Sequence, residues 1–156
     1  KYMSGASIEE LSTFIEDTRL KVCHWFIVDD LEQLKRGGRI SAVAATFGKA
    51  LQIKPLLSVD NIGRLVNVAK IRGKSNVINS LVEQYLRDAE DTKKGTVFIA
   101  HADNEQGALE LQKAIKGKCS ECQICEIGPV IGAHVGFGML AILFLGKRDL
   151  TLAVKK

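Results

Sequence analysis

Hydrophobic and polar positions recur along the chain with two periods, which predict helices and strands in turn. Apolar residues three or four positions apart predict helices over 8–20, 31–36, 42–51 and 75–91, and from a cap at Asp103 to 116. Runs of β-branched and aromatic residues predict strands over 22–28, 53–59, 64–71, 96–100, 122–127 and 139–145. Turn residues at 60–63 join two strands into a hairpin. The order predicts an α/β (α+β) fold, a mixed β-sheet with an antiparallel hairpin, covered by helices.

Capping residues support the predicted helix starts. Ser7 and Glu10 have the S-x-x-E spacing of a capping box, so the first helix is expected to begin next to Ser7. Asp30 and Ser41 directly precede two further predicted helices and can accept hydrogen bonds from their first turns. Asp103 is expected to cap the last predicted helix.

Composition narrows the class of protein. The 156 residues fit one domain, and 46% hydrophobic with 26% charged residues is ordinary for a globular protein. A net charge of +4, with few aromatic residues for base stacking, argues against nucleic-acid binding. No apolar run reaches the roughly 20 residues of a membrane span, and the first residues lack the apolar segment of a signal peptide. We therefore expect a cytoplasmic location.

Three of the four cysteines form a C-x2-C-x2-C pattern, at Cys119, Cys122 and Cys125. Such a pattern can bind zinc or an iron–sulfur cluster, but no fourth cysteine follows at a matching spacing. Strand periodicity also predicts that Cys122 and Cys125 point to opposite faces of the sheet. We therefore expect reduced thiols, no metal and no cofactor.

The segment 128–138 carries the strongest candidate for chemistry. It holds four glycines, one proline and the ionisable side chain of His134, directly before the last predicted strand. Glycines allow an irregular backbone that approaches a ligand closely, and an imidazole can bind a polar head group. A purely structural role for the glycines and for His134 is equally compatible with the pattern.

Five motifs in order give a resemblance that covers nearly the whole chain. Segment 128–138 resembles the G-P-x-I-G-x-H-x-G-x-G signature of DegV-like fatty-acid-binding proteins, and 28–40 resembles their D-D-L-x-x-L-x-R-G-G-R-I segment. Shorter matches are Ile-Lys-Pro-Leu-Leu at 53–57, Lys-Ile-Arg-Gly at 70–73 and Ile-Ala-His-Ala-Asp at 99–103. Two positions depart from the family pattern: Val135 stands where a hydroxyl residue is common, and Phe137 where proline is common.

The resemblance implies a protein that binds a long-chain fatty acid and presents it to a fatty-acid kinase, with no catalysis of its own. It places the carboxylate head near His134. The implied ligand-binding residues are His134, Gly132, Gly136, Gly138, Phe137 and Arg39. A small-residue helix over 42–51 and the strands around Leu56 and Ile142 are expected to wall an acyl tunnel.

The resemblance also implies that this chain is the C-terminal part of a longer protein. Residues 1–21 would then belong to, or link from, an N-terminal domain, and 22–156 would form the DegV-like lipid-binding domain. A fragment exposing an apolar groove is expected to form a homodimer. Two basic clusters, which include Arg36 and Arg72, are solvated surface or a weak docking face for a partner.

Two alternatives stay open at this point. A small hydrolase or transferase could use His134 with Asp29 or Asp30, although no G-x-S-x-G elbow or other activated nucleophile is evident. A regulatory or scaffold domain would bind nothing at its glycine-rich segment. His101, at the end of a strand, and His24, within one, are interpreted as structural.

Overall fold

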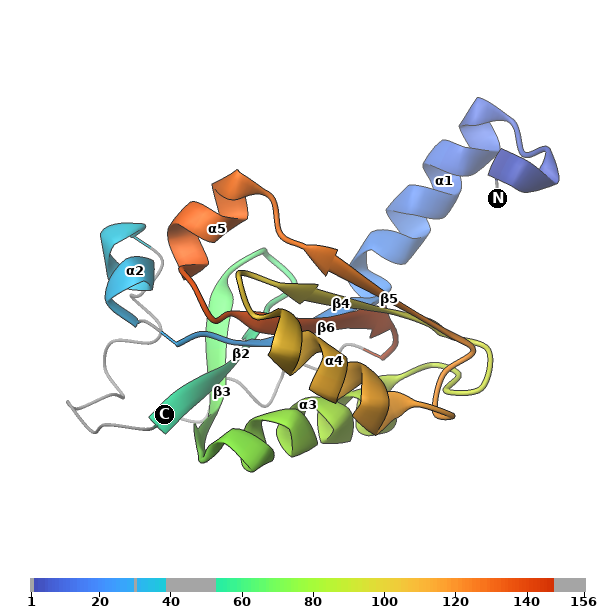
Figure 1. The fold of residues 1–156 in the computed structure, drawn as a ribbon. Coiled ribbons are helices and arrows are strands. Elements are labelled where there is room, and N and C mark those ends of the chain that lie inside the picture. The colour runs from blue at the N-terminus through green and yellow to red at the C-terminus, as the bar shows by residue number, and fades with distance from the viewer. Residues whose placement is uncertain (1, 30, 39–52, 148–156) are drawn as a thin grey trace.

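The computed structural model describes residues 2–29, 31–38 and 53–147 of the chain (Figure 1). Six strands form one sheet: β1 (Val22–Ile27), β2 (Ile53–Val59), β3 (Leu65–Arg72), β4 (Thr96–His101), β5 (Glu121–Glu126) and β6 (Leu140–Leu145). All six were predicted, within one or two residues at each end. The caps at Asp30 and Ser41, the helix over 42–51 and Arg39 lie outside the described residues.

The strands lie in the order β3-β2-β1-β6-β4-β5. β4 and β5 pair in parallel, and every other neighbouring pair is antiparallel. The predicted hairpin is β2–β3, closed by the turn in which Gly63 has a φ of 82°. The prediction of a mixed sheet with covering helices is therefore confirmed.

Two helices cover one face of the sheet. They are α3 (Lys74–Asp88) and α4 (Glu105–Ile115), which pack against each other and against the strands (Figure 1). Alternate strand residues meet them in one buried cluster that includes Trp25, Ile99 and Leu111. Leu56 and Ile142 also belong to this cluster, packed under α3 and α4. The acyl tunnel expected along these strands stays a prediction, and the side chains of Leu56 and Ile142 themselves face α3 and α4.

Two short helices lie over the opposite face, α2 (Leu31–Arg36) and α5 (Pro129–Val135). They pack side by side at the end of the sheet where β1 and β4 end (Figure 1). A second buried cluster lies beneath them, with Phe26, Leu57 and Ala141 from the strands and Val135 from α5. The sheet thus presents a separate apolar layer to the α2–α5 pair.

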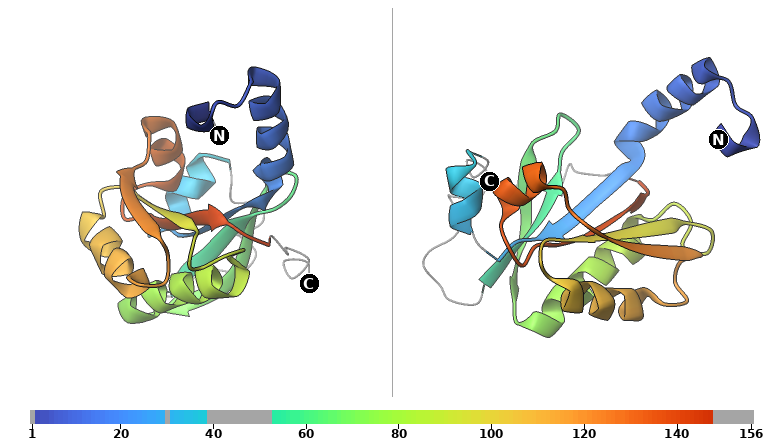
Figure 2. Two further views of the ribbon diagram at one scale, coloured as in Figure 1. Left: turned by 90° about the vertical axis from the view of Figure 1, so that its right-hand side faces the viewer. Right: turned by 45° about the horizontal axis from the view of Figure 1, so that its top comes forward.

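The first helix, α1 (Ile8–Thr18), extends away from the sheet and buries none of its side chains (Figure 2). Its capping box is confirmed: Ser7 Oγ accepts from the N–H of Glu10, and the Glu10 carboxylate accepts from the N–H of Ser7. Ile8 is 73% exposed and Ile15 is 55% exposed. One turn of 3-10 helix before α1 (Tyr2–Ser4) and another after it (Arg19–Lys21) complete this segment.

Two predicted helix boundaries are wrong, each for a structural reason. α3 ends at Asp88 rather than at Asp91, because Ala89 leaves the helical conformation with a ψ of 133° and the N–H of Glu90 donates to the carbonyl of Leu145 at 3.1 Å. The cap of α4 is Asn104 and not Asp103, which takes a positive φ of 47°. Asn104 Oδ1 accepts from the N–H of Gly107 at 3.2 Å.

Candidate functional site

The glycine-rich segment 128–138 is mostly helical. Pro129 lies in the first turn of α5, where its fixed φ suits a helix and its missing N–H costs nothing. The helix ends at Gly136, whose φ is 74°, and Gly138 has a φ of 81°. The predicted irregular backbone is therefore wrong for residues 129–135 and correct for the stretch that follows them.

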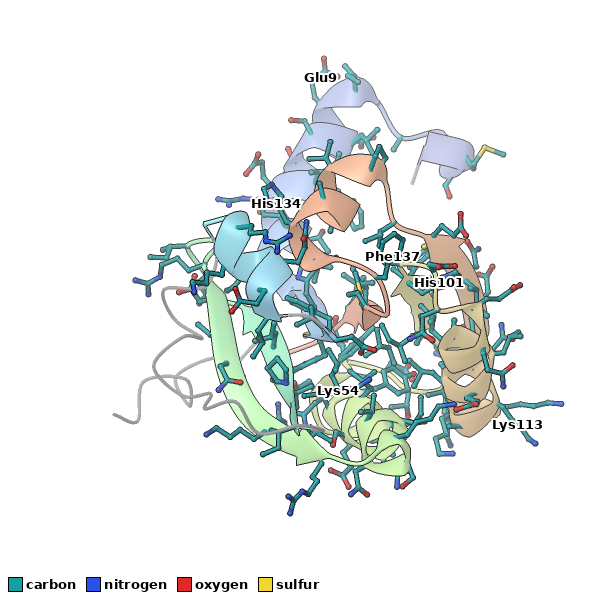
Figure 3. All side chains as sticks on the ribbon, turned by 60° about the vertical axis from the view of Figure 1, so that its left-hand side comes forward. Glu9, Lys54, His101, Lys113, His134 and Phe137 are labelled. Carbon is teal, nitrogen blue, oxygen red and sulfur yellow. The ribbon has the colours of Figure 1, made fainter. Side chains whose placement is uncertain are left out.

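His134 lies in the last turn of α5, on the side that faces α2 (Figure 3). A Cβ atom on Gly37 would stand 2.5 Å from its Nδ1 atom. Within the described part of the chain, this buried Nδ1 has no hydrogen-bond partner. The second ring nitrogen, Nε2, is the other hydrogen-bonding group of this imidazole.

Gln33 of α2 fixes α5 in place and was not foreseen from the sequence. Its Nε2 atom donates to the carbonyl oxygen of Ala133 at 2.5 Å. Its Cγ atom would lie 3.2 Å from a Cβ atom on Gly136, so glycine there lets the two segments approach. No pattern in the sequence marks Gln33, since it is one polar residue within a short amphipathic helix.

A pocket of about 600 Å³ opens on the other side of α5. It is lined by Gln33, His101, Ala102, Asp103, Glu126, Ile127, Gly128, Pro129, Gly132, Ala133, Gly136 and Phe137. The structure thus brings Gly132, Gly136 and Phe137 to one cavity, whereas His134 lies toward α2 (Figure 3). The carboxylates of Asp103 and Glu126 give this pocket a negative charge, which disfavours an anionic head group inside it.

Gly138 lies outside the lining of this pocket and packs closely against the end of β1. A Cβ atom on Gly138 would stand 2.6 Å from Oδ2 of Asp29. The N–H of Gly138 donates to the carbonyl of Ala102 at 2.8 Å, and its own carbonyl accepts from Asn104 Nδ2 at 3.0 Å. Gly138 therefore allows close packing at the start of β6, a structural reason for its glycine.

The two family departures lie in contrasting surroundings. Val135 is 5% exposed within the apolar cluster beneath α5, where a hydroxyl group would need a buried partner. Phe137 is 77% exposed at the mouth of the pocket. A contact between Phe137 and a bound ligand stays a prediction.

The two basic clusters lie at one end of the sheet. α2, which carries Arg36, follows the end of β1, where Ile27 pairs with Leu56 of β2. Arg72 pairs with Ile53 at the same end of β2, so it lies toward that end of the sheet. Arg36 and Arg72 are both exposed. Lys74, near Arg72, forms an ion pair of 3.1 Å with Glu110 and is not a free cation.

Among the described residues of the enzyme alternative, Asp29 and His134 do not form a hydrogen-bonded pair. Asp29 Oδ1 accepts from Lys54 Nζ at 2.6 Å, and no hydrogen bond joins Asp29 to His134 in the described ranges. Asp30 lies outside those ranges. His101 is 4% exposed, and its Nδ1 accepts from the N–H of Asn104 at 3.3 Å, as fits a structural histidine at the start of a helix.

Among residues 2–29, 31–38 and 53–147, no group of three His, Cys, Asp or Glu side chains could hold a metal ion. Cys122 packs against the cluster under α3 and α4, whereas Cys125 is exposed on the alternate face of β5, as the periodicity predicts. Burial raises the pKa of the Cys119 and Cys122 thiols. No helix in the described part is long and apolar enough to cross a membrane.

Comparison with known proteins identifies the family. Residues 2–147 match the family model described as "Uncharacterised protein, DegV family". A DegV domain-containing protein of Clostridium perfringens is 42% identical over 144 residues, which are 91% of this chain and 50% of that protein. The chain spans about half the length of the curated relatives that it matches.

Solved structures show the same fold. A DegV family protein from Thermus thermophilus, described by its fatty-acid binding, is 27% identical over 93% of this chain and 52% of its own, with a TM-score of 0.82. DegV from Bacillus subtilis, described as a fatty acid binding protein, is 32% identical over 92% of this chain and 51% of its own, with a TM-score of 0.73. The chain belongs to the DegV family.

Proposed function

We propose that this chain forms part of a binding site for a long-chain fatty acid and has no catalytic activity of its own. The observation that carries the proposal is the match of almost the whole chain to DegV proteins described as binding fatty acids. The lack of a catalytic pairing between Asp29 and His134 supports a binding role over hydrolysis or transfer.

The carboxylate head is placed at His134, on the α2 side of α5. A carboxylate is costly to bury unless hydrogen-bond donors surround it, and Nε2 of His134 can supply one. The acidic pocket on the other side of α5 is a poorer place for an anion, because Asp103 and Glu126 line it. Gly132, Gly136 and Phe137 would then hold the backbone around His134 in place. Arg39 remains proposed as a residue that binds the carboxylate.

The acyl tail is placed on the same face of the sheet as α2 and α5. Phe26, Leu57 and Val135 form the apolar layer next to His134. Each buried methylene contributes about 0.8 kcal/mol, so such a layer can hold a long chain when water is excluded. On the same strands, the side chains of Leu56 and Ile142 face the other layer, under α3 and α4.

We also propose that residues 1–21 pack against a further domain and that 22–156 form the lipid-binding domain. Within the described part of the chain α1 buries none of its side chains, and the relatives are about twice as long as this chain. A homodimer that covers the same face is the proposed state of the chain by itself.

A fatty-acid kinase remains the proposed acceptor of the bound lipid, and the cytoplasm the proposed location. The exposed cations of Arg36 and Arg72 support docking of an acidic partner at that end of the sheet. None of the four cysteines, all within the described residues, forms a disulfide, which fits a reducing compartment.

Native mass spectrometry of the protein purified from cells tests the proposed ligand. A co-purified mass that corresponds to a long-chain fatty acid, released by denaturation, supports the proposal. Titration with a fluorescent fatty acid gives the affinity directly. An absence of both the co-purified lipid and saturable binding, in the chain and in a longer protein that contains it, would refute the proposal.

A further inference from the structure

The proposed function does not use the cysteines. Two of them, Cys119 and Cys122, are separated by two residues and pack against the same part of the fold. Cys119 follows α4, and Cys122 is the second residue of β5. Both thiols are free and partly buried, whereas Cys125 is exposed on the opposite face of the strand. The C-x2-C spacing is the one that redox-active cysteine pairs use.

The structure places both thiols in the same surroundings. Cys119 and Cys122 pack against the same buried cluster, the one covered by α3 and α4. Both also line one surface groove of about 610 Å³, together with Lys113 and Lys116 of α4. The groove is open to solvent, so a small oxidant can reach the two sulfur atoms.

Tyr85 contacts the backbone next to Cys119. The hydroxyl of Tyr85 donates to the carbonyl oxygen of Lys118, the neighbour of Cys119, at 2.8 Å. The charges of Cys119 and Cys122 both act on the ionisation of Tyr85, and a charge on Cys119 acts on that of Cys122. Tyr85 itself belongs to the buried cluster against which Cys119 and Cys122 pack.

We propose that Cys119 and Cys122 are a redox modification site, at which a peroxide converts the two thiols into an intrachain disulfide. The disulfide would join the segment between α4 and β5 to the second residue of β5, across Ser120 and Glu121. A disulfide in a protein of a reducing compartment is transient and reversible by cellular thiols. The site is independent of the fatty-acid proposal.

The chemistry is balanced with hydrogen peroxide as the oxidant. One thiolate attacks a peroxide oxygen, the O–O bond breaks, and a sulfenic acid and one water result. The second thiolate attacks the sulfenic sulfur, the S–O bond breaks, and the hydroxide leaves as a second water. The two sulfur atoms lose two electrons, and the two thiol protons end in the two waters.

The experiment treats the folded chain with hydrogen peroxide at about pH 8.5, where a larger share of the thiols is ionised. Remaining thiols are then alkylated, and the chain is cleaved after glutamate. Cleavage at Glu121 separates Cys119 from Cys122, so a disulfide between them holds two peptides together until a reductant is added. We expect this linked pair, with a mass lower by two hydrogens than the sum of its peptides.

Variants give the matched controls. Cys125→Ser should form the linked pair as the parent chain does, whereas Cys119→Ser and Cys122→Ser should form none. The chain unfolded in denaturant is a positive control, because it shows that the oxidant can form a disulfide within the C-x2-C pair when no folded structure constrains it. Formation of the pair in the unfolded chain alone, or preferential pairing with Cys125 or with another molecule, would overturn the proposal.

Discussion

Gly37 and His134 meet where the ends of α2 and α5 pack together: a Cβ atom on Gly37 would stand 2.5 Å from His134 Nδ1. Real Cβ atoms do not approach that closely, so the imidazole occupies the space that a side chain on Gly37 would need. Gln33 adds a hydrogen bond of 2.5 Å to the carbonyl of Ala133. The motif that ends α2 therefore positions the histidine of α5, although about a hundred residues separate them.

Gly37→Ala should destabilise the chain by displacing His134. Overpacking at a close contact costs about 1–3 kcal/mol, partly offset by the lower entropy of the unfolded chain with alanine. Urea denaturation of Gly37→Ala, His134→Ala and the double variant measures the coupling. We expect the double variant to regain stability relative to Gly37→Ala. Strictly additive effects would show that the two residues do not touch.

His134→Ala should weaken fatty-acid binding, if the head group lies at Nε2 as proposed. Loss of one hydrogen bond to a charged group costs about 1–3 kcal/mol, which corresponds to roughly a 5- to 150-fold weaker affinity. His134→Gln keeps an N–H donor and should retain part of the affinity. Fluorescent fatty-acid titration measures both variants. Equal affinity of His134→Ala and the parent protein would remove His134 from the site.

The sequence was sufficient for the fold because each strand and long helix has its own local signal. Periodicity placed six strands and α3, and the capping residues placed the start of α1. The segment 128–138 was harder to predict, since four glycines outweighed the helix signal that Pro129 gives at its first turn. Nor does a sequence pattern indicate which side of a seven-residue helix faces a neighbour, so the separation of His134 from the pocket was not foreseen.

Long-range partners account for the other differences. Gln33 acts on Ala133 and Gly136, and Asn104 on Gly138, through contacts that no local pattern encodes. The alternation along β6 showed that Ile142 and Ala141 face opposite layers, but not which layer lies beneath α5. These relationships depend on packing between elements that are distant in the sequence.

Gly138→Ala should destabilise the chain for two reasons that a matched control can separate. Gly138 has a φ of 81°, and a Cβ atom there would lie 2.6 Å from Asp29 Oδ2. Gly63 has a φ of 82° with open space around it, so Gly63→Ala reports the backbone term alone. That term is about 1–2 kcal/mol, and we expect Gly138→Ala to cost roughly 1–3 kcal/mol more. Equal unfolding free energies in a denaturant titration would exclude crowding by Asp29.

Phe137→Pro should leave the stability of the fold nearly unchanged. Phe137 is 77% exposed, and the residue before it is glycine, which has no Cβ to clash with a proline ring. The change is expected within about 1 kcal/mol, since proline also restricts the unfolded chain. Thermal unfolding checks the stability, and comparison of the co-purified lipids checks the function. A changed lipid profile at unchanged stability would show that Phe137 contacts the ligand.

Tyr85 should make the stability of the chain fall in strongly alkaline solution. Burial, followed by the nearby charges of Cys119, Asp91 and Cys122, raises the pKa of Tyr85 from its usual 10.0 to about 12. The folded state therefore holds the phenolic proton more tightly than the unfolded state. This contribution to stability is complete below pH 10, and it is lost as the pH rises from there toward 12.

Tyr85→Phe isolates this contribution from that of the lysines, which titrate in the same range. The variant loses the hydrogen bond of 2.8 Å to the Lys118 carbonyl but keeps the edge-on contact with Phe144, whose ring centre lies 5.0 Å away. Below pH 10 we expect it to be less stable than the parent chain by about 1 kcal/mol. That deficit should shrink as the pH rises, because only the parent chain has a phenol to ionise. Urea denaturation of both chains between about pH 7 and pH 11.5 measures the difference. A deficit that stays constant across the range would mean that Tyr85 ionises equally easily in the folded and unfolded states.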